Sequence, residues 1–206
     1  MPTLTEQSAV ARAASLAARP GRTILGLAGA PAAGKSTLAA TLAAAVPGAV
    51  VVGMDGWHLA HSVLVARGDV ADKGAPWTFD GDGYLALLRR VRAAAGPVWA
   101  PEFRRELEDA VAGAVLVAPG CPLVITEGNY LLLDEEPWRS ARALCDEVWQ
   151  VSVPEPLRVD RLVARHVAHG RTPEAARERA THGIDAANAR LVLRMAARAD
   201  AVVTLS

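Results

Sequence analysis

Short apolar runs alternate along the chain with longer segments in which apolar residues recur at helical spacing. The apolar runs predict buried strands, and the periodic segments predict helices. The predicted strands cover residues 23–28, 49–54, 123–127, 147–153 and 200–205, and residues 115–117 form a further short apolar stretch. The predicted helices cover residues 3–19, 36–45, 84–95, 157–168 and 173–197, with a further helix that contains Trp138. This alternation is typical of a mainly parallel sheet flanked by helices, in which ligands bind at the carboxyl ends of the strands.

A polar segment at residues 68–83 interrupts the alternation, because it is too rich in Gly, Asp and Pro for regular structure. Irregular segments of this length in a compact domain are usually functional. A short extended piece is expected at 98–103. The chain has 206 residues, of which 51% are hydrophobic, and this suits one α/β domain with a full core. We therefore expect a single domain over residues 1–206.

The segment from Gly29 to Thr37 fits the phosphate-binding pattern G-x-x-x-x-G-K-[ST] at every fixed position. It lies between a predicted strand and a predicted helix, which is the context that the motif requires. Glycines let successive N–H groups surround an anion at the helix N-terminus. The pattern predicts an ATP site in which Lys35 reaches the β- and γ-phosphates and Ser36 binds Mg²⁺. The loop positions are Gly29, Ala30, Pro31, Ala32, Ala33, Gly34, Lys35, Ser36 and Thr37.

Lysine is rare in this sequence, which has twenty arginines and only two lysines, Lys35 and Lys73. Because Arg supplies positive charge almost everywhere else, the Lys in the loop indicates that a compact ammonium is needed there. The alternative, a Gly-rich turn with a chance lysine, explains neither this choice nor the flanking elements.

The overall charge excludes some classes of function. The formal net charge is zero and the isoelectric point is near 7, which argues against a mainly electrostatic nucleic-acid binder or membrane-surface protein. No run of 18 apolar residues predicts a membrane span, and the N-terminus carries Glu6 in place of a signal sequence. We expect a cytoplasmic protein in which Cys121 and Cys145 are reduced packing residues.

Two carboxylates stand where predicted strands end. Asp55 follows the strand at 49–54, where a carboxylate can face a hydroxyl nucleophile and take its proton; the alternative is a cap for a helix that begins near His58. Glu127 ends the strand at 123–127, where it can bind Mg²⁺ directly or through water; the alternative is a side chain that turns into solvent. Together with the phosphate loop, the pair is more specific than either residue alone.

Arginines cluster in and after the helix predicted at 157–168, at Arg158, Arg161, Arg165 and Arg171. Mobile arginines that close over phosphates stabilise the transferred charge and exclude water. In an Arg-rich chain such residues also often do no more than solvate a helix. The five histidines show no metal-binding spacing, so we expect surface or supporting roles for them.

The chain resembles the P-loop kinases of the uridine kinase, pantothenate kinase and phosphoribulokinase group. Within this group it most resembles the bacterial relatives described as nucleoside/nucleotide or sugar-transport-associated kinases. The likeness spans about residues 20–195. It is carried by the phosphate loop, Met54-Asp55-Gly56-Trp57-His58-Leu59, Lys73-Gly74-Ala75-Pro76 with Thr78-Phe79-Asp80, Glu127-Gly128-Asn129-Tyr130-Leu131-Leu132, and Arg165-His166 followed by Asp185 and Asn188.

The resemblance implies an ATP- and Mg²⁺-dependent kinase that phosphorylates a hydroxyl of a nucleoside-, pantothenate- or sugar-like metabolite. It implies that Asp55 is the base, that Lys35 and Arg165 act on the phosphates, that Arg171 is a second lid residue on the nucleotide, and that Glu127 and Ser36 hold the metal. The implied acceptor-binding residues are Asp55, Trp57, His58, Lys73, Phe79, Asp80, Phe103 and Asn129. A homodimer is a further expectation at family level.

The sequence departs from this family after Phe103. Relatives often carry Phe-Asp-Arg there, whereas this chain has Phe103-Arg104-Arg105. An arginine at the acidic position would favour an anionic acceptor.

Two other classes of function compete with a kinase. A P-loop switch or chaperone that hydrolyses nucleotide needs no small-molecule acceptor, but the chain has no Asn-Lys-x-Asp segment for reading guanine, since its other lysine lies in Asp72-Lys73-Gly74. A binding module without catalysis conflicts with the full set of catalytic groups.

Overall fold

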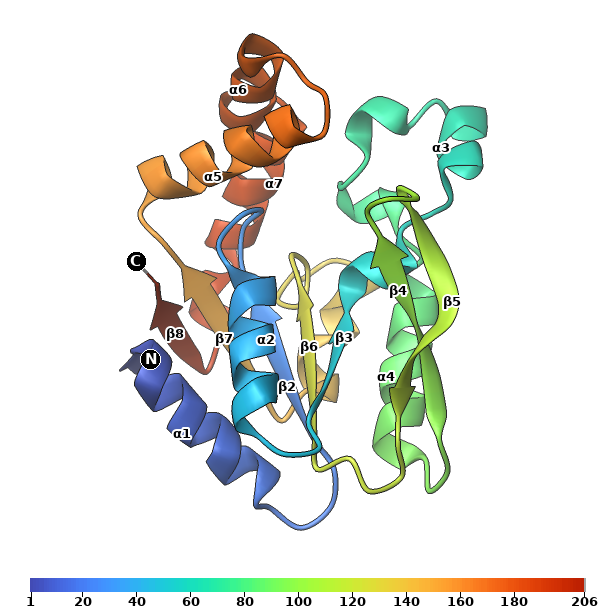
Figure 1. Ribbon diagram of the computed structural model, residues 1–206, viewed down its shortest axis with the longest axis vertical. Helices are drawn as coiled ribbons and strands as arrows, with labels where there is room; N and C mark the ends of the chain where they lie inside the picture. The colour runs from blue at the N-terminus through green and yellow to red at the C-terminus, as the bar shows by residue number, and fades with distance from the viewer. Residues whose placement is uncertain (206) are drawn as a thin grey trace.

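A six-stranded sheet forms the centre of the computed structural model, which describes residues 1–205 (Figure 1). The strand order is β1-β8-β7-β2-β6-β3, and every neighbouring pair is parallel. The predicted α/β fold class is therefore confirmed, and the carboxyl ends of the strands meet at one edge of the sheet. The strands are β1 (Thr3–Leu4), β2 (Thr23–Ala28), β3 (Val50–Gly53), β6 (Leu123–Gly128), β7 (Glu147–Ser152) and β8 (Ala201–Thr204).

Hydrophobic cores lie on both faces of this sheet. On one face α1 (Glu6–Ala17) and α2 (Lys35–Ala45) pack against the strands. On the other face α4 (Gly81–Ala93) packs together with residues 130–145. Neighbouring strand residues go to opposite cores, as Ile24 and Leu25 do. The central strands are therefore apolar along their whole length, which is why they appear as uninterrupted runs in the sequence.

Two groups of elements rise beyond the carboxyl edge of the sheet, on either side of the loop that follows β2 (Figure 1). One is an antiparallel hairpin of β4 (Val98–Arg104) and β5 (Asp109–Val117), with α3 (His61–Arg67) near its turn. The other consists of α5 (Glu155–Ala168), α6 (Pro173–Thr181) and α7 (Ile184–Arg194).

Two predicted helices were too long. The helix predicted at 3–19 begins only at Glu6, because Thr3 and Leu4 pair with β8 and the side chain of Thr5 caps the helix by accepting a hydrogen bond from the Ser8 N–H. The helix predicted at 173–197 is divided into α6 and α7 at Gly183. The chain packs tightly there, since a Cβ at Gly183 would lie 2.9 Å from the Arg179 Cα.

Other predicted elements changed their type or partner. The short apolar stretch 115–117 is the end of β5 in the hairpin. The polar segment 68–83 contains two 3₁₀ turns, and α4 begins within it at Gly81 because Asp80 caps that helix. The helix expected around Trp138 is a 3₁₀ turn of three residues, Trp138–Ser140. Among the described residues, no helix has the length and apolar character needed to cross a membrane.

Trp138 is central to one of the two cores, so its replacement tests the packing. It is 1% exposed, and its ring lies 5.5 to 6.0 Å from the rings of Tyr130, Phe79 and Tyr84. Trp138→Ala should lower the free energy of unfolding by about 3–5 kcal/mol, because it leaves a large cavity. Urea titration measures this loss. Trp77→Ala is the control, since Trp77 is 50% exposed, and a loss of similar size there would contradict the assignment of the core.

Candidate active site

The loop between β2 and α2 has the backbone conformation of an anion-binding turn. Gly34, the N-cap of α2, has φ of 92°, which glycine adopts without strain. Gly29 has no room for a side chain, since a Cβ there would lie 2.8 Å from the Val151 carbonyl oxygen. The N-terminus of α2 therefore faces the carboxyl edge of the sheet with free N–H groups.

The ammonium of Lys35 is folded back against this loop and is 8% exposed. Its Nζ donates hydrogen bonds to the carbonyl oxygens of Gly29 at 3.0 Å and Ala30 at 3.2 Å, and to Asn129 Oδ1 at 2.8 Å. Burial lowers the pKa of Lys35, while the nearby carboxylates of Glu127 and Asp55 raise it. All three hydrogen-bond acceptors are uncharged, so a phosphate brought to this ammonium would be its first direct ionic partner.

Ser36 and Glu127 form a second polar group beside Lys35. Ser36 Oγ donates to Glu127 Oε1 at 2.9 Å. Burial raises the pKa of Glu127, and Asp55 raises it further, whereas Lys35 lowers it. A half-buried carboxylate next to a hydroxyl is a donor set that fits Mg²⁺. No group of three or more His, Cys, Asp or Glu side chains among residues 1–205 could hold a metal by itself. Mg²⁺ usually takes several of its ligands from water and substrate phosphates.

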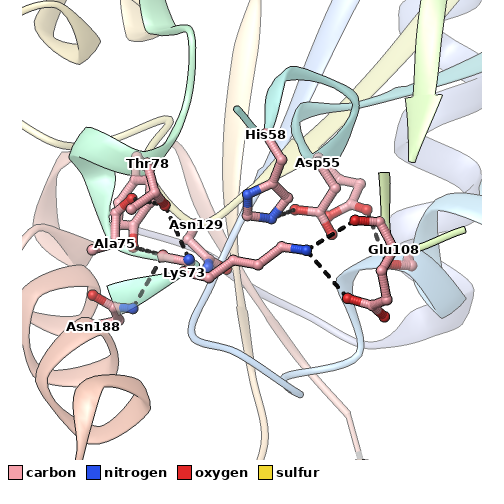
Figure 2. Close-up of polar contacts among 12 residues, drawn as sticks. Asp55, His58, Lys73, Ala75, Thr78, Glu108, Asn129 and Asn188 are labelled. Carbon is pink, nitrogen blue, oxygen red and sulfur yellow. Dashed lines mark hydrogen bonds and ion pairs between the residues drawn. The ribbon is translucent and has the colours of Figure 1, made fainter. Parts of the chain in front are cut away.

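Asp55 lies in the 3₁₀ turn Met54–Trp57 that follows β3, and its side chain is 42% exposed. It does not cap a helix: α3 starts at His61 with Ala60 as its N-cap. Its charge acts on the pKa of both Lys35 and Glu127, which places it at the same end of the cleft. Asp55 Oδ1 is 3.9 Å from His58 Nε2 (Figure 2).

Aromatic rings form a wall beside Asp55. The His58 ring stacks on Phe79 with a centroid distance of 3.9 Å, and the Phe103 ring meets it edge-on at 5.2 Å. Burial lowers the pKa of His58, which favours the neutral imidazole, and Asp55 opposes this effect. Nδ1 of His58 is buried without a hydrogen-bond partner among the described residues. A planar, partly apolar surface therefore lies next to a carboxylate.

Lys73 joins two parts of the structure that are distant in sequence. Its Nζ donates to the backbone oxygen of Glu108 at 3.0 Å and to Glu108 Oε2 at 3.2 Å, and it lies 5.1 Å from the centre of the Phe103 ring (Figure 2). Its own carbonyl accepts a hydrogen bond from Arg179 at 2.9 Å. Lys73 thus lines the cleft while it holds the β4–β5 turn in place.

Helix α5 is attached to the phosphate loop by a buried arginine. Arg158 Nη1 donates to the Pro31 carbonyl at 3.1 Å, and Nε and Nη2 each bond Glu155 at 2.7 Å. Arg161 lies about one turn after Arg158 and Arg165 about two turns after it, and both line the cleft. Arg171, which follows the helix, lines it as well. Burial lowers the pKa of Arg165. The predicted lid arginines therefore divide into one structural residue and three that face the cleft.

A cleft of 1340 Å³ connects these groups. It gathers most of the predicted site at the carboxyl edge of the sheet. The predicted residues that line it are Pro31, Ala32, Gly34, Lys35, Ser36, Thr37, Asp55, His58, Lys73, Phe79, Phe103, Glu127, Asn129, Arg165 and Arg171. Gly29, Ala30 and Ala33 belong to the loop behind this surface, and the first two present their carbonyls to Lys35.

Two residues of the predicted acceptor set lie elsewhere. Trp57 is buried in the core with its ring 5.1 Å from that of Tyr84. The carboxylate of Asp80 accepts a hydrogen bond from the Gly83 N–H at 2.8 Å as the cap of α4. Arg104, expected to favour an anionic acceptor, is also outside the cleft, where its Nε is 2.6 Å from Glu102 Oε2. The resemblance implied a stacking wall at Trp57 and a hydroxyl-binding carboxylate at Asp80, but core packing and helix capping occupy these two side chains.

Known proteins are similar in sequence to this chain over most of its length. The sequence is 44% identical over 131 residues to the "ATP-dependent kinase-like protein notR'" of Aspergillus versicolor, which covers 60% of this chain and 76% of that protein. It is 36% identical over 182 residues, or 82% of this chain and 77% of the relative, to the "Putative uridine kinase C227.14" of Schizosaccharomyces pombe. The chain belongs to the uridine kinase-like P-loop kinases. No protein-family model matches it.

A solved structure supports the same assignment for this kinase. The "putative fructose transport system kinase" of Silicibacter sp. TM1040 superimposes with a TM-score of 0.85 and 38% identity, and the match covers 96% of this chain and 98% of that one. The uridine and fructose in these names are substrates of the named proteins. What the likeness shows for this chain is a P-loop kinase.

The cleft of the kinase also contains residues that the sequence did not single out. Among them are Arg105, Leu107 and Glu108 from the hairpin turn and Arg179 from α6. Arg179 donates to the carbonyls of Ala71 at 3.0 Å and Lys73 at 2.9 Å. In a chain with twenty arginines, neither residue type nor spacing distinguishes such a residue from a solvated one.

Lys35→Ala tests the nucleotide site. The change removes the buried cation, so Mg·ATP should lose the fixed charge that faces its β- and γ-phosphates and nearly all turnover should disappear. Calorimetry with Mg·ATP is the measurement. Lys73→Ala is the matched control, because Lys73 is the other lysine of the cleft and does not belong to the phosphate loop. Wild-type affinity in the Lys35 variant would mean that nucleotide binds elsewhere.

Proposed function

We propose that this kinase uses Mg²⁺ to transfer the γ-phosphate of ATP to a hydroxyl group of a small metabolite. The observation that carries the proposal is the position of Asp55. It stands between the phosphate loop with Lys35 on one side and the aromatic wall of His58 on the other, in one cleft. An enzyme that only hydrolyses nucleotide would need the phosphate loop and Lys35 but not the aromatic wall.

Asp55 is the proposed base. Its exposed carboxylate can accept a hydrogen bond from an acceptor hydroxyl and take the proton as the oxygen attacks phosphorus. His58 Nε2 lies 3.9 Å from that carboxylate. Because burial lowers the pKa of His58, its neutral ring can lie beside a bound acceptor without adding charge to the acceptor site.

The other side of the cleft binds the triphosphate. Lys35 and the loop N–H groups would hold the β- and γ-phosphates, and Ser36 and Glu127 would hold Mg²⁺. A bound Mg²⁺ would neutralise charge on the phosphate oxygens. Arg165 and Arg171 would stabilise the transferred group as α5 and α6 close over it, and the same movement would exclude water.

The wall of His58, Phe79 and Phe103 favours an acceptor with a planar or apolar part next to its hydroxyl. We propose to screen three classes of acceptor: nucleosides, pantothenate-like compounds and sugars. The names of the similar proteins add uridine and fructose to the compounds to be tested. We propose that residues 1–206 act as one kinase domain in the cytoplasm.

A P-loop switch or chaperone that hydrolyses nucleotide is the second candidate. The free carboxylate of Asp55 and the ring wall have no role in such a protein, so the two candidates differ in one measurement. ADP release should be stimulated by an acceptor in a kinase. It should be unaffected by every small hydroxyl compound in a switch.

Asp55→Asn tests the assignment of the base. The change keeps volume and shape but removes the negative charge and the ability to accept a proton. We expect kcat to fall by about 10²- to 10⁴-fold, with less than a roughly tenfold change in Mg·ATP affinity. Turnover is measured by coupled ADP release with the acceptor that the screen over nucleosides, pantothenate, ketohexoses, pentoses and glycerate identifies.

Asp80→Asn is the control for this measurement. Asp80 caps α4, and Asn caps a helix about as well as Asp. Its variant should therefore keep both stability and kcat. Near-normal kcat in Asp55→Asn would contradict the assignment of Asp55 as the base and favour the nucleotide-hydrolysing switch.

The lid arginines should affect turnover more than resting affinity. Arg165→Ala and Arg171→Ala each remove a contact that forms mainly when the site closes, so kcat should fall while the ATP dissociation constant changes little. Steady-state kinetics and calorimetry separate the two effects. If both variants turn over normally, these side chains only solvate the helix and its following loop.

A further inference from the structure

Two arginines face the same cleft from opposite sides. Arg165 comes from α5, and Arg105 comes from the turn between β4 and β5; both line the cleft. Neither guanidinium has an ion pair or a side-chain hydrogen bond with any other residue in the described range 1–205. Figure 1 shows the hairpin turn and α5 on opposite sides of the phosphate loop. An anion that binds between two positive charges is stabilised by both of them.

The turn that carries Arg105 has a defined structure. The Leu107 N–H bonds the Arg104 carbonyl at 3.1 Å, and the Glu108 N–H bonds the Arg105 carbonyl at 3.3 Å. Glu108 is in turn held by two hydrogen bonds from Lys73, at 3.0 and 3.2 Å. The turn is therefore attached to the floor of the cleft and does not hang free.

Within this turn the two neighbouring arginines have different surroundings. Arg104 lies 2.6 Å from Glu102 Oε2 and 3.8 Å from Glu106 Oε1, outside the cleft. Arg105 has no such partner and is directed to the cleft. The chain thus neutralises one arginine on the surface and leaves the charge of the next one available to a ligand.

The charge of Arg105 acts at the phosphate end of the cleft. Burial lowers the pKa of Arg165, and among the nearby charges Arg105 lowers it most. Arg105 and Arg165 line the same cleft as Ser36 and Glu127. Although it comes from the hairpin, Arg105 therefore shares a cleft with the phosphate loop.

We propose that Arg105 contacts the transferring phosphoryl group from the acceptor side, opposite Arg165. This inference rests on the proposed kinase function. The planar guanidinium presents several donors in a fixed fork that matches phosphate oxygens. The phosphoryl group would then be held by Lys35 from the loop, Arg165 from the lid and Arg105 from the hairpin.

The assignment gives the hairpin two functions. Phe103 contributes to the wall for the acceptor, and Arg105, two residues later, contributes charge at the reacting group. Lys73, which fixes Glu108, is a positioning residue for both. The hairpin, held in place by Lys73, would therefore both position the acceptor and contribute to charge stabilisation.

The test compares a ground-state and a transition-state complex without any acceptor. Mg·ADP alone lacks the transferred group, whereas Mg·ADP with aluminium fluoride mimics it. Calorimetry should show that Arg105→Ala binds Mg·ADP like the wild type but binds Mg·ADP with aluminium fluoride about tenfold or more weakly, as expected for a lost charged hydrogen bond. Arg105→Lys should recover only part of this loss.

Arg104→Ala is the matched control, since it removes an adjacent arginine that lies outside the cleft, and it should bind both complexes like the wild type. Urea unfolding of each variant checks that the hairpin is intact. Arg165→Ala should show the same selective loss as Arg105→Ala.

Three results would overturn the inference. If Arg105→Ala and the wild type bind the fluoride complex equally, Arg105 does not contact the phosphoryl group, and the proposed kinase function is unaffected. An equal loss for Mg·ADP with and without fluoride would make Arg105 a residue of the nucleotide site in general. A loss seen only as a raised KM for anionic acceptors would assign it to the acceptor. Failure of the wild type itself to bind Mg·ADP would instead contradict the proposed function.

Discussion

The structure depends on one buried charge. The ammonium of Lys35 is almost fully removed from solvent, and its hydrogen-bond partners are two backbone carbonyls and one amide oxygen. Burying a charge with neutral partners only is unfavourable, and the lowered pKa of Lys35 reflects this cost. The remainder of the fold compensates for it by rigid support. Gly29 packs against the Val151 carbonyl, and Arg158 fixes the Pro31 carbonyl from α5.

A continuous set of hydrogen bonds extends from α5 to the β4–β5 hairpin. His166 on α5 bonds Asp185 at 2.7 Å, and Asp185 also bonds Arg179 at 3.1 Å. Arg179 bonds the Lys73 carbonyl, and Lys73 reaches Glu108. Asn188 adds a bond of 3.1 Å to the Gly74 carbonyl (Figure 2). Segment 71–75 therefore lies between the two walls of the cleft and contacts both, although it has little regular structure of its own.

The twenty arginines of the chain illustrate why composition says little about roles. Arg158 is buried and braces the phosphate loop, Arg104 is exposed and paired with Glu102, and Arg165 faces the cleft without a partner within the described structure. The three residues have the same chemistry and differ only in what lies around them. Partners, burial and direction are properties of the folded chain, so a count of arginines could not separate structural, surface and ligand-facing residues.

The sequence by itself determined the parallel sheet, the phosphate loop and the two strand-end carboxylates, because buried strands and glycine turns depend on local patterns of apolarity and backbone freedom. Only the tertiary structure decided which neighbours of these motifs reach the cleft. His58 lines it and Trp57 does not, and Arg105 lines it and Arg104 does not. Successive residues in turns and strands point in different directions, and the direction that meets the ligand is set by packing against segments far away in the chain.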